Sequence, residues 1–199
     1  VFLSGIIGSQ ISPLKSLSTL PMSISVVGIA IGAIFASKLM SITGRKVGFM
    51  VASIVNTLVS ILAAYSIFAQ SFSIYCVANF LLGMGMAFTH QYRFAAAESV
   101  SEDKAPKAIS YLLLSGIIAG FIGISLADYT KNFFSDHMYV GSYIILSILT
   151  FLPAIFLFFF KNKNEIEFSK NDEITTRSYL ESIKGPRFLQ ALTSAAFAY

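Results

Sequence analysis

The sequence predicts an all-helical membrane protein, a polytopic bundle of about six transmembrane helices followed by a truncated seventh. The first observation is composition: 12% of the 199 residues are charged and 55% are hydrophobic, with a mean hydropathy of +0.73. A soluble domain usually carries about 25% charged residues, so this composition argues against a soluble enzyme or nucleic-acid-binding domain. The second observation is spacing, because four intervals hold 22, 46, 20 and 24 residues without Asp, Glu, Lys or Arg. A helix that crosses the roughly 30 Å hydrocarbon core needs about 20 apolar residues, so the longest interval holds two spans.

These intervals, together with Pro and Gly, set the expected elements in chain order. A partial first helix is expected to end near Gly8, with a turn at residues 12–15 and a basic loop at 38–46. Pro153 lies inside the sixth span, where neighbouring helices can accommodate a kink. Pro186 is placed to begin a further helix. The full spans are expected at about 17–37, 47–69, 74–98, 108–127 and 138–160.

The predicted domain organisation has three parts. Residues 1–160 form an N-terminal transmembrane bundle, residues 161–185 a cytoplasmic central loop, and residues 186–199 the start of a C-terminal bundle. Because the chain begins at Val1 and stops at Tyr199 within apolar stretches, we expect its first and last helices to be truncated.

Basic residues predict the orientation of the bundle, because loops rich in Lys and Arg stay in the cytoplasm. The loops on the opposite side contain two, Lys15 and Lys131, and Arg93 lies within a span. We therefore expect loops 38–46, 98–107 and 161–185 to be cytoplasmic. The eleven basic residues that follow the second, fourth and sixth spans are Lys38, Arg45, Lys46, Lys104, Lys107, Lys161, Lys163, Lys170, Arg177, Lys184 and Arg187.

The segment between the second and third spans reads SKLMSITGRK over residues 37–46. It resembles the loop signature of the major facilitator superfamily, which has the form G-x-L-x-D-R-x-G-R-K. Leu39, Gly44, Arg45 and Lys46 match this signature, whereas serines stand at its first Gly and at its Asp. In the family that Asp contributes to a charged cytoplasmic latch, so the serine at position 41 departs from the pattern.

The fourth and fifth spans are similar to the same family. Glycines at 83 and 85, Glu98 at the inner end and Lys107 before the next span follow the family pattern, while Asn79 stands where the family often has an Arg. The polar segment 161–185 lies where the family joins its two six-helix halves. The resemblance covers nearly the whole chain.

What the resemblance implies is a secondary transporter that moves a small solute by alternating access between two bundles. The implied partners are a small-molecule substrate, a coupling ion such as a proton, and the lipid bilayer, with no nucleic acid and no cofactor. The expected location is a bacterial inner membrane. Three alternatives stay open: another six-helix transporter class, a membrane-embedded enzyme, and a membrane scaffold. No cluster of acids, nucleophile with a base, or metal-ligand set appears in the sequence to support an enzyme.

Arg93 is the main candidate for a substrate-binding residue. A charge inside a span is costly unless it faces a cavity or a partner. At helical spacing, Asn79, His90 and Arg93 share one face, which predicts a cavity wall that could bind an anionic group. The alternatives are that Arg93 extends to the cytoplasmic interface or pairs with a carboxylate elsewhere, and that His90 is a packed, hydrogen-bonded residue.

Gly44, Arg45, Lys46 and Glu98 are the candidates for a cytoplasmic gate. Glu98 is about 140° around the helix from Arg93, so these two residues are not expected to pair. By resemblance Glu98 could instead meet Arg45; the alternative is a solvated residue at a helix end.

Small and polar residues inside the spans suggest helix contacts. Helix packing is expected at Gly83, Gly116, Gly120 and Gly123, because small residues let helices approach closely. The polar residues Ser53, Asn56, Thr57 and Ser60 of the third span could face the cavity or bond between helices, and stay unassigned.

Overall fold

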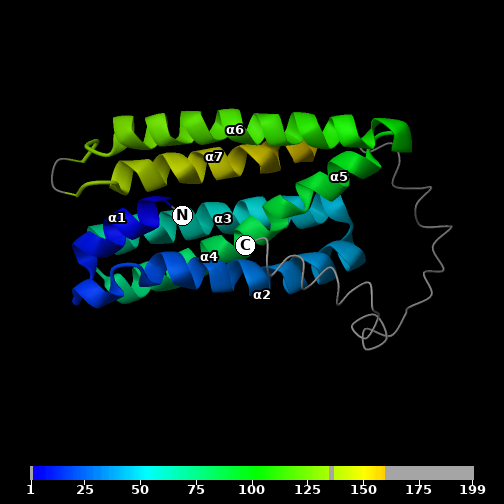
Figure 1. The fold of residues 1–199 in the computed structure, drawn as a ribbon. Coiled ribbons are helices and arrows are strands. Elements are labelled where there is room, and N and C mark those ends of the chain that lie inside the picture. Colours follow the sequence, from blue (N-terminus) through cyan, green and yellow to red (C-terminus); the bar gives the residue numbers. More distant parts are fainter. Residues whose placement is uncertain (1, 135–136, 160–199) are drawn as a thin grey trace. The chain divides into compact units, whose positions relative to one another are not determined.

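The computed structural model describes residues 2–134 and 137–159, which lie within the first of two compact units, Val1–Phe160 and Lys161–Tyr199. The expected central loop and seventh helix lie outside the described residues. The described part is helical throughout, with 3-10 turns at Lys15–Leu17 and Glu102–Lys104. Its helices are α1 (Phe2–Ile11), α2 (Leu20–Thr43), α3 (Arg45–Phe68), α4 (Phe72–His90), α5 (Tyr92–Glu98), α6 (Ala105–Thr130) and α7 (Val140–Phe159) (Figure 1).

Five helical segments of the described chain are long and apolar enough to cross a membrane, with α4 and α5 counted as one segment. α1 has ten residues, or about 15 Å of helix, and reaches across about half of a hydrocarbon core. These elements agree with the predicted polytopic helical bundle.

Several expected boundaries were wrong. The basic loop predicted at 38–46 is helical, because α2 continues to Thr43 and α3 begins at Arg45. Only Gly44 separates them, with φ 80° and ψ 161°, a backbone conformation that a residue with a Cβ rarely adopts. Lys38 did not end the helix, because a lysine near a helix terminus extends its amine to water.

The predicted span 74–98 is interrupted. α4 ends at His90 and α5 begins at Tyr92, so the single residue Gln91 separates two helices that point in different directions (Figure 1). The first helix also continues past Gly8 to Ile11, and α6 begins at Ala105 because Pro106 suits a first helical turn.

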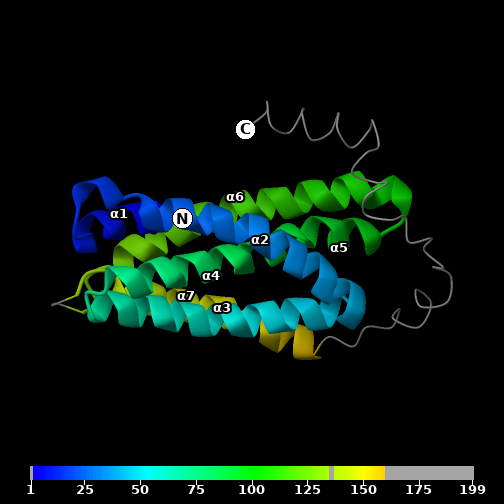
Figure 2. The same cartoon turned by 90° about the horizontal axis from the view of Figure 1, so that it is seen from below.

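Glycine brings α2 and α4 into close contact, and the two helices run side by side in Figures 1 and 2. A Cβ built on Gly28 would lie 2.2 Å from the Phe80 carbonyl oxygen, and one on Gly83 would lie 2.1 Å from the Ser25 carbonyl oxygen. A Cβ built on Gly32 would lie 2.6 Å from the Met84 Cα. The two backbones can approach this closely only because these residues carry no side chain.

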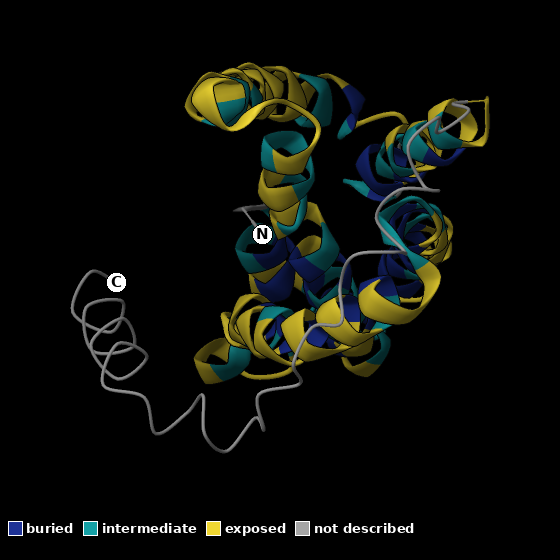
Figure 3. Cartoon of the chain, turned by 90° about the vertical axis from the view of Figure 1, so that its right-hand side faces the viewer, coloured by how far each residue is buried: buried dark blue, intermediate teal, exposed yellow. Residues whose placement is uncertain are grey.

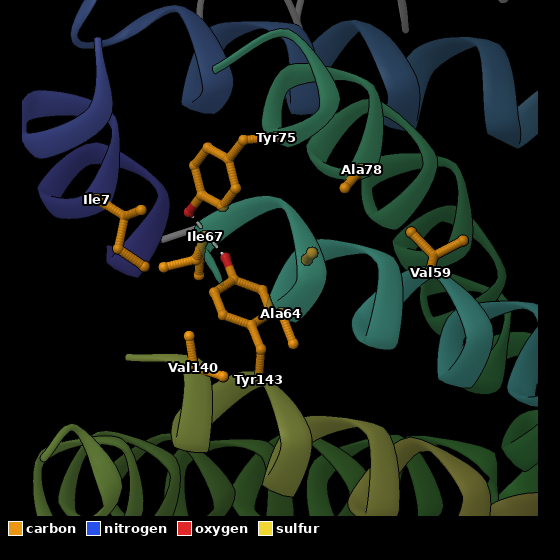
Figure 4. Close-up of a cluster of buried hydrophobic side chains, with 9 residues drawn as sticks. Ile7, Val59, Ala64, Ile67, Tyr75, Ala78, Val140 and Tyr143 are labelled. Atoms are coloured by element: carbon orange, nitrogen blue, oxygen red, sulfur yellow. Dashed lines mark hydrogen bonds between the residues drawn. The ribbon is translucent and has the colours of Figure 1, made fainter. Parts of the chain in front are cut away.

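α3 packs against both α4 and α7. The contacts of α3 include a cluster of buried hydrophobic side chains, among them Ile7, Ile67 and Val140 (Figure 4). Tyr75 and Tyr143 meet inside this cluster edge to face, with ring centroids 6.1 Å apart and hydroxyl oxygens 2.9 Å apart. Each tyrosine thus buries its ring and satisfies its hydroxyl group.

α6 is the least covered helix. Its contacts are with α5 and α7, and Thr130 is its only buried residue within the described chain. In Figure 3 this helix, at the top, is exposed along most of its length. Large apolar side chains such as Ile117 and Phe121 are exposed along it, as are Phe156 and Phe158 on α7.

Links between helices define the two ends of the bundle. At one end Arg45, at the start of α3, meets Glu98, at the end of α5. At the other end the ring of Phe68, the last residue of α3, contacts His137 in the link between α6 and α7. Lys131 in that link binds the Asp128 carboxylate at 2.6 Å, and this hydrogen bond and charge raise the pKa of the Lys131 amine.

Candidate functional site

A cavity of about 300 Å³ lies between α1, α2, α4, α6 and α7. Apolar side chains, among them Leu82, Met86 and Leu146, form most of its wall, together with Gly120 and Gly123 of α6. An apolar wall with a small number of polar groups is typical of a site for a small organic molecule. The polar residues of the wall are Ser4, Ser25, Asn79, Thr130, Ser142 and Tyr143.

Asn79 is the centre of a buried hydrogen-bond network at this wall. Its side chain is 2% exposed, its Oδ1 accepts from the Ser4 hydroxyl at 2.5 Å, and its Nδ2 donates to the Tyr75 carbonyl at 2.8 Å. The Tyr75 hydroxyl in turn meets Tyr143, which lines the cavity. The network connects α1, α4 and α7, so it fixes the orientation of the Asn79 amide.

A second polar group joins α6 to α7 at the cavity. The Ser142 hydroxyl donates to the Ala127 carbonyl at 2.9 Å, and the Thr130 hydroxyl lies 3.2 Å from Ser142 Oγ. Every polar side chain lining the cavity is therefore a hydroxyl or an amide, and no described lining residue is charged. Such a wall offers hydrogen bonds to a solute but no counter-charge.

His90 and Arg93 do not line this cavity. Asn79 lines the cavity from α4, whereas His90, the last residue of α4, and Arg93, in α5 beyond the break at Gln91, are exposed. Among the described residues no carboxylate lies within ion-pair distance of Arg93. Its role in binding stays a prediction.

The structure brings two of the four gate candidates together. Arg45 Nη2 lies 2.5 Å from Glu98 Oε1, and the side chains are 34% and 50% exposed. Phe49, one turn further along α3, stacks on Tyr92 at a centroid distance of 4.4 Å. α5 is thus held on the start of α3 by one ionic and one aromatic contact.

The other gate candidates have different surroundings. Gly44 forms the one-residue corner between α2 and α3, and Lys46 follows Arg45 in the first turn of α3. A second hollow of about 240 Å³ at this end is lined by Ser37, Met40, Ser41, Arg45 and Gln91. Ser41 stands where the family signature has Asp, and its hydroxyl donates to the Lys38 carbonyl of its own helix.

The predicted packing glycines behave in two ways. Gly83 lies against the Ser25 backbone, whereas a Cβ on Gly116, Gly120 or Gly123 would meet no atom within 4 Å. The described residues thus give these three α6 glycines no close helix partner, and their packing role stays a prediction.

Sequence reasoning missed the cavity residues of α1 and α7 and the close contact of α2. Ser4 and Tyr143 carry no signal of their own, because their role depends on how three helices meet. Gly28 and Gly32 did carry one: their spacing of four places both glycines on one helix face.

Comparison with known proteins places these features in context. The sequence model of the Major Facilitator Superfamily matches residues 2–199. The chain is 29% identical over 199 residues to the riboflavin transporter RfnT of Brucella anthropi, and the alignment covers 100% of this chain and 50% of that protein. The chain therefore spans about half the length of the curated relative it matches. No solved structure matches it significantly.

Proposed function

Since the chain belongs to the major facilitator superfamily and contains several membrane-spanning helices, we propose that it forms part of a transporter that moves a small solute by alternating access. In this mechanism two helix bundles rock around a central site. The described helices would form part of one such bundle. We place the protein in a bacterial inner membrane, which the bacterial relative supports.

The observation that carries the solute class is the uncharged cavity wall. A fully or partly desolvated charge in a cavity without a counter-charge is costly, so the wall formed by Asn79, Ser142 and Tyr143 favours a neutral solute with hydrogen-bonding groups. Riboflavin fits this description, because it is neutral at pH 7 and combines a planar ring with a hydroxylated chain. Together with the name of the relative, this makes riboflavin the first solute to test.

Coupling to a proton would require a group that titrates. The described lining of the cavity contains hydroxyl and amide groups but no carboxylate or histidine. We therefore propose that any proton coupling uses residues outside this lining.

The test is uptake of labelled riboflavin by proteoliposomes that contain the full-length protein. Replacing Asn79 with Ala should raise the apparent KM by about 2- to 10-fold, because a typical hydrogen bond contributes about 0.5–1.5 kcal/mol. Ser110→Ala is the matched control, since this exposed hydroxyl bonds only to the Pro106 carbonyl of its own helix. Unchanged uptake in Asn79→Ala would remove Asn79 from the solute site.

Variants of Arg93 test the alternative, an anionic solute, in the same uptake experiment. If the solute is neutral and bound in the cavity, Arg93→Lys and Arg93→Met should both keep a near-normal KM. If Arg93 binds an anionic group, Arg93→Met should abolish binding and Arg93→Lys should weaken it, because lysine lacks the fixed fork of donors. A parallel screen with anionic solutes separates these outcomes: uptake of anions alone would reject the neutral-solute proposal while keeping the transporter.

A further inference from the structure

Pro153 leaves a gap in the backbone hydrogen bonds of α7. Proline has no N–H, so the Leu149 carbonyl has no donor four residues on, and the proline ring crowds that carbonyl. In a membrane such a helix is tolerated only where neighbouring groups satisfy the freed backbone. Pro153 lies 14th among the 20 residues of α7, well inside the span.

Ser53 of α3 supplies a hydroxyl at this turn. Ser53 Oγ donates to the Thr150 carbonyl and accepts from the Ala154 backbone N–H at 3.1 Å. An α-helix normally pairs these two backbone groups with each other, since they lie four residues apart. The Ser53 hydroxyl thus bridges a donor and an acceptor of α7 next to the proline.

The surroundings of Ser53 are buried and contain further contact between α3 and α7. Ser53 and Ala154 are both 6% exposed. One turn along α3, the Thr57 hydroxyl lies 3.3 Å from the Thr150 hydroxyl, which extends the contact between the same two helices. Ser60, by contrast, bonds only to the Asn56 carbonyl of its own helix at 2.8 Å.

We propose that Ser53 is a joint that binds the α7 backbone beside Pro153, at the Thr150 carbonyl and the Ala154 N–H, and makes α3 and α7 move as one body. The cavity-lining residues of α7, from Ser142 to Leu149, all precede Pro153. The joint therefore fixes the direction of the cavity wall relative to the rest of α7. It is independent of which solute is carried.

The experiment is a double-mutant cycle in the full-length protein, read by reversible unfolding in mixed micelles. Ser53→Ala should raise the unfolding equilibrium constant about 3- to 16-fold, the range expected from measured interhelical hydrogen bonds in membranes. Ser60→Ala is the matched control and should have a smaller effect, because its bond lies within one helix. In a Pro153→Ala background the Ser53→Ala effect should shrink to that of Ser60→Ala, because α7 can then complete its own ladder.

Hydrogen exchange gives a local readout that a general loss of stability does not reproduce. In Ser53→Ala the Ala154 amide should exchange faster than amides elsewhere in α7, and in Ser53→Ala/Pro153→Ala it should be protected again. Ser53→Thr keeps the hydroxyl and should resemble the wild type.

Two results would contradict the proposal that Ser53 joins α3 to α7. One is an equal cost of Ser53→Ala with and without Pro153; the other is an unfolding constant no different from that of Ser60→Ala. If Ser53→Ala does not fold, recovery of folding by adding Pro153→Ala supports the proposal. Failure of that double variant, where Pro153→Ala alone folds, rejects it.

Discussion

The contact between Arg45 and Glu98 joins residues that are 53 positions apart, and both side chains remain partly in water. An exposed ion pair of this kind contributes about 0–1 kcal/mol, because water screens it. That amount has little effect on the free energy of folding, but it can change the relative populations of two conformations of similar free energy. A difference of 1 kcal/mol changes their ratio about 5-fold.

The first prediction at the residue scale is that Glu98→Gln slows transport by up to about 5-fold and favours the inward-facing state, with little loss of folding. This result is expected on the proposal that the Arg45–Glu98 pair holds the cytoplasmic end closed when the transporter faces outward. Uptake rates and the labelling of a cysteine in the cavity measure these effects. Arg45→Glu combined with Glu98→Arg should restore part of the activity. Glu102→Gln, an exposed acid nearby, is the control, and full activity of Glu98→Gln would leave Glu98 as a solvated helix end.

At the level of helices, the second prediction concerns the contact of α2 with α4. Gly28→Ala should destabilise the protein by about 1–3 kcal/mol, because its Cβ would meet the backbone of Phe80, which cannot move aside as a side chain can. Gly116→Ala on α6 is the control, since its Cβ would meet nothing within 4 Å. Thermal unfolding in detergent compares the two variants. A loss in Gly116→Ala as large as that in Gly28→Ala would show that helix contact is not the cause.

The helices themselves were largely predictable, because a span must be about 20 apolar residues long and charges mark its ends. The residues at which the helices begin and end were less predictable. The run 38–43 is polar enough to suggest a loop, yet it lacks a helix breaker before Gly44, and so α2 continues. The break at Gln91 has no Pro or Gly beside it, and the next residue, Tyr92, contacts Phe49 of α3, a tertiary contact that the local sequence does not reveal.

The candidate site was predictable only where one helix carries it. Asn79 could be found because helical spacing places it on a polar face. The same spacing did not show that His90, the last residue of α4, and Arg93, beyond the break at Gln91, lie outside the cavity lining. Their role in binding stays a prediction. Ser53 could not be assigned, because its hydrogen-bond partners outside its own helix, the Thr150 carbonyl and the Ala154 N–H, lie about 100 residues away in α7.

For the whole molecule, the third prediction concerns orientation in the membrane. In a Cys76→Ser background, single cysteines at Ser41 and Asn171 should resist an impermeant thiol reagent applied to intact cells, and a cysteine at Asn132 should react. The physical reason is that, apart from Arg93, eleven of the thirteen basic residues follow the second, fourth and sixth predicted spans, and basic residues between spans favour the cytoplasmic side. Permeabilised cells provide the control, in which the Ser41 and Asn171 variants become labelled. Labelling at position 41 in intact cells would show that the predicted orientation is wrong.

The uncharged cavity wall also has an electrical consequence. A charge that crosses the membrane gains or loses about 2.3 kcal/mol per 100 mV. A neutral solute held by Asn79, Ser142 and Tyr143 moves no charge through this field. Its passage alone generates no current and does not respond to the membrane voltage. Any current measured during transport therefore reports a coupling ion or the displacement of a charged side chain such as Arg93, and its size counts those charges.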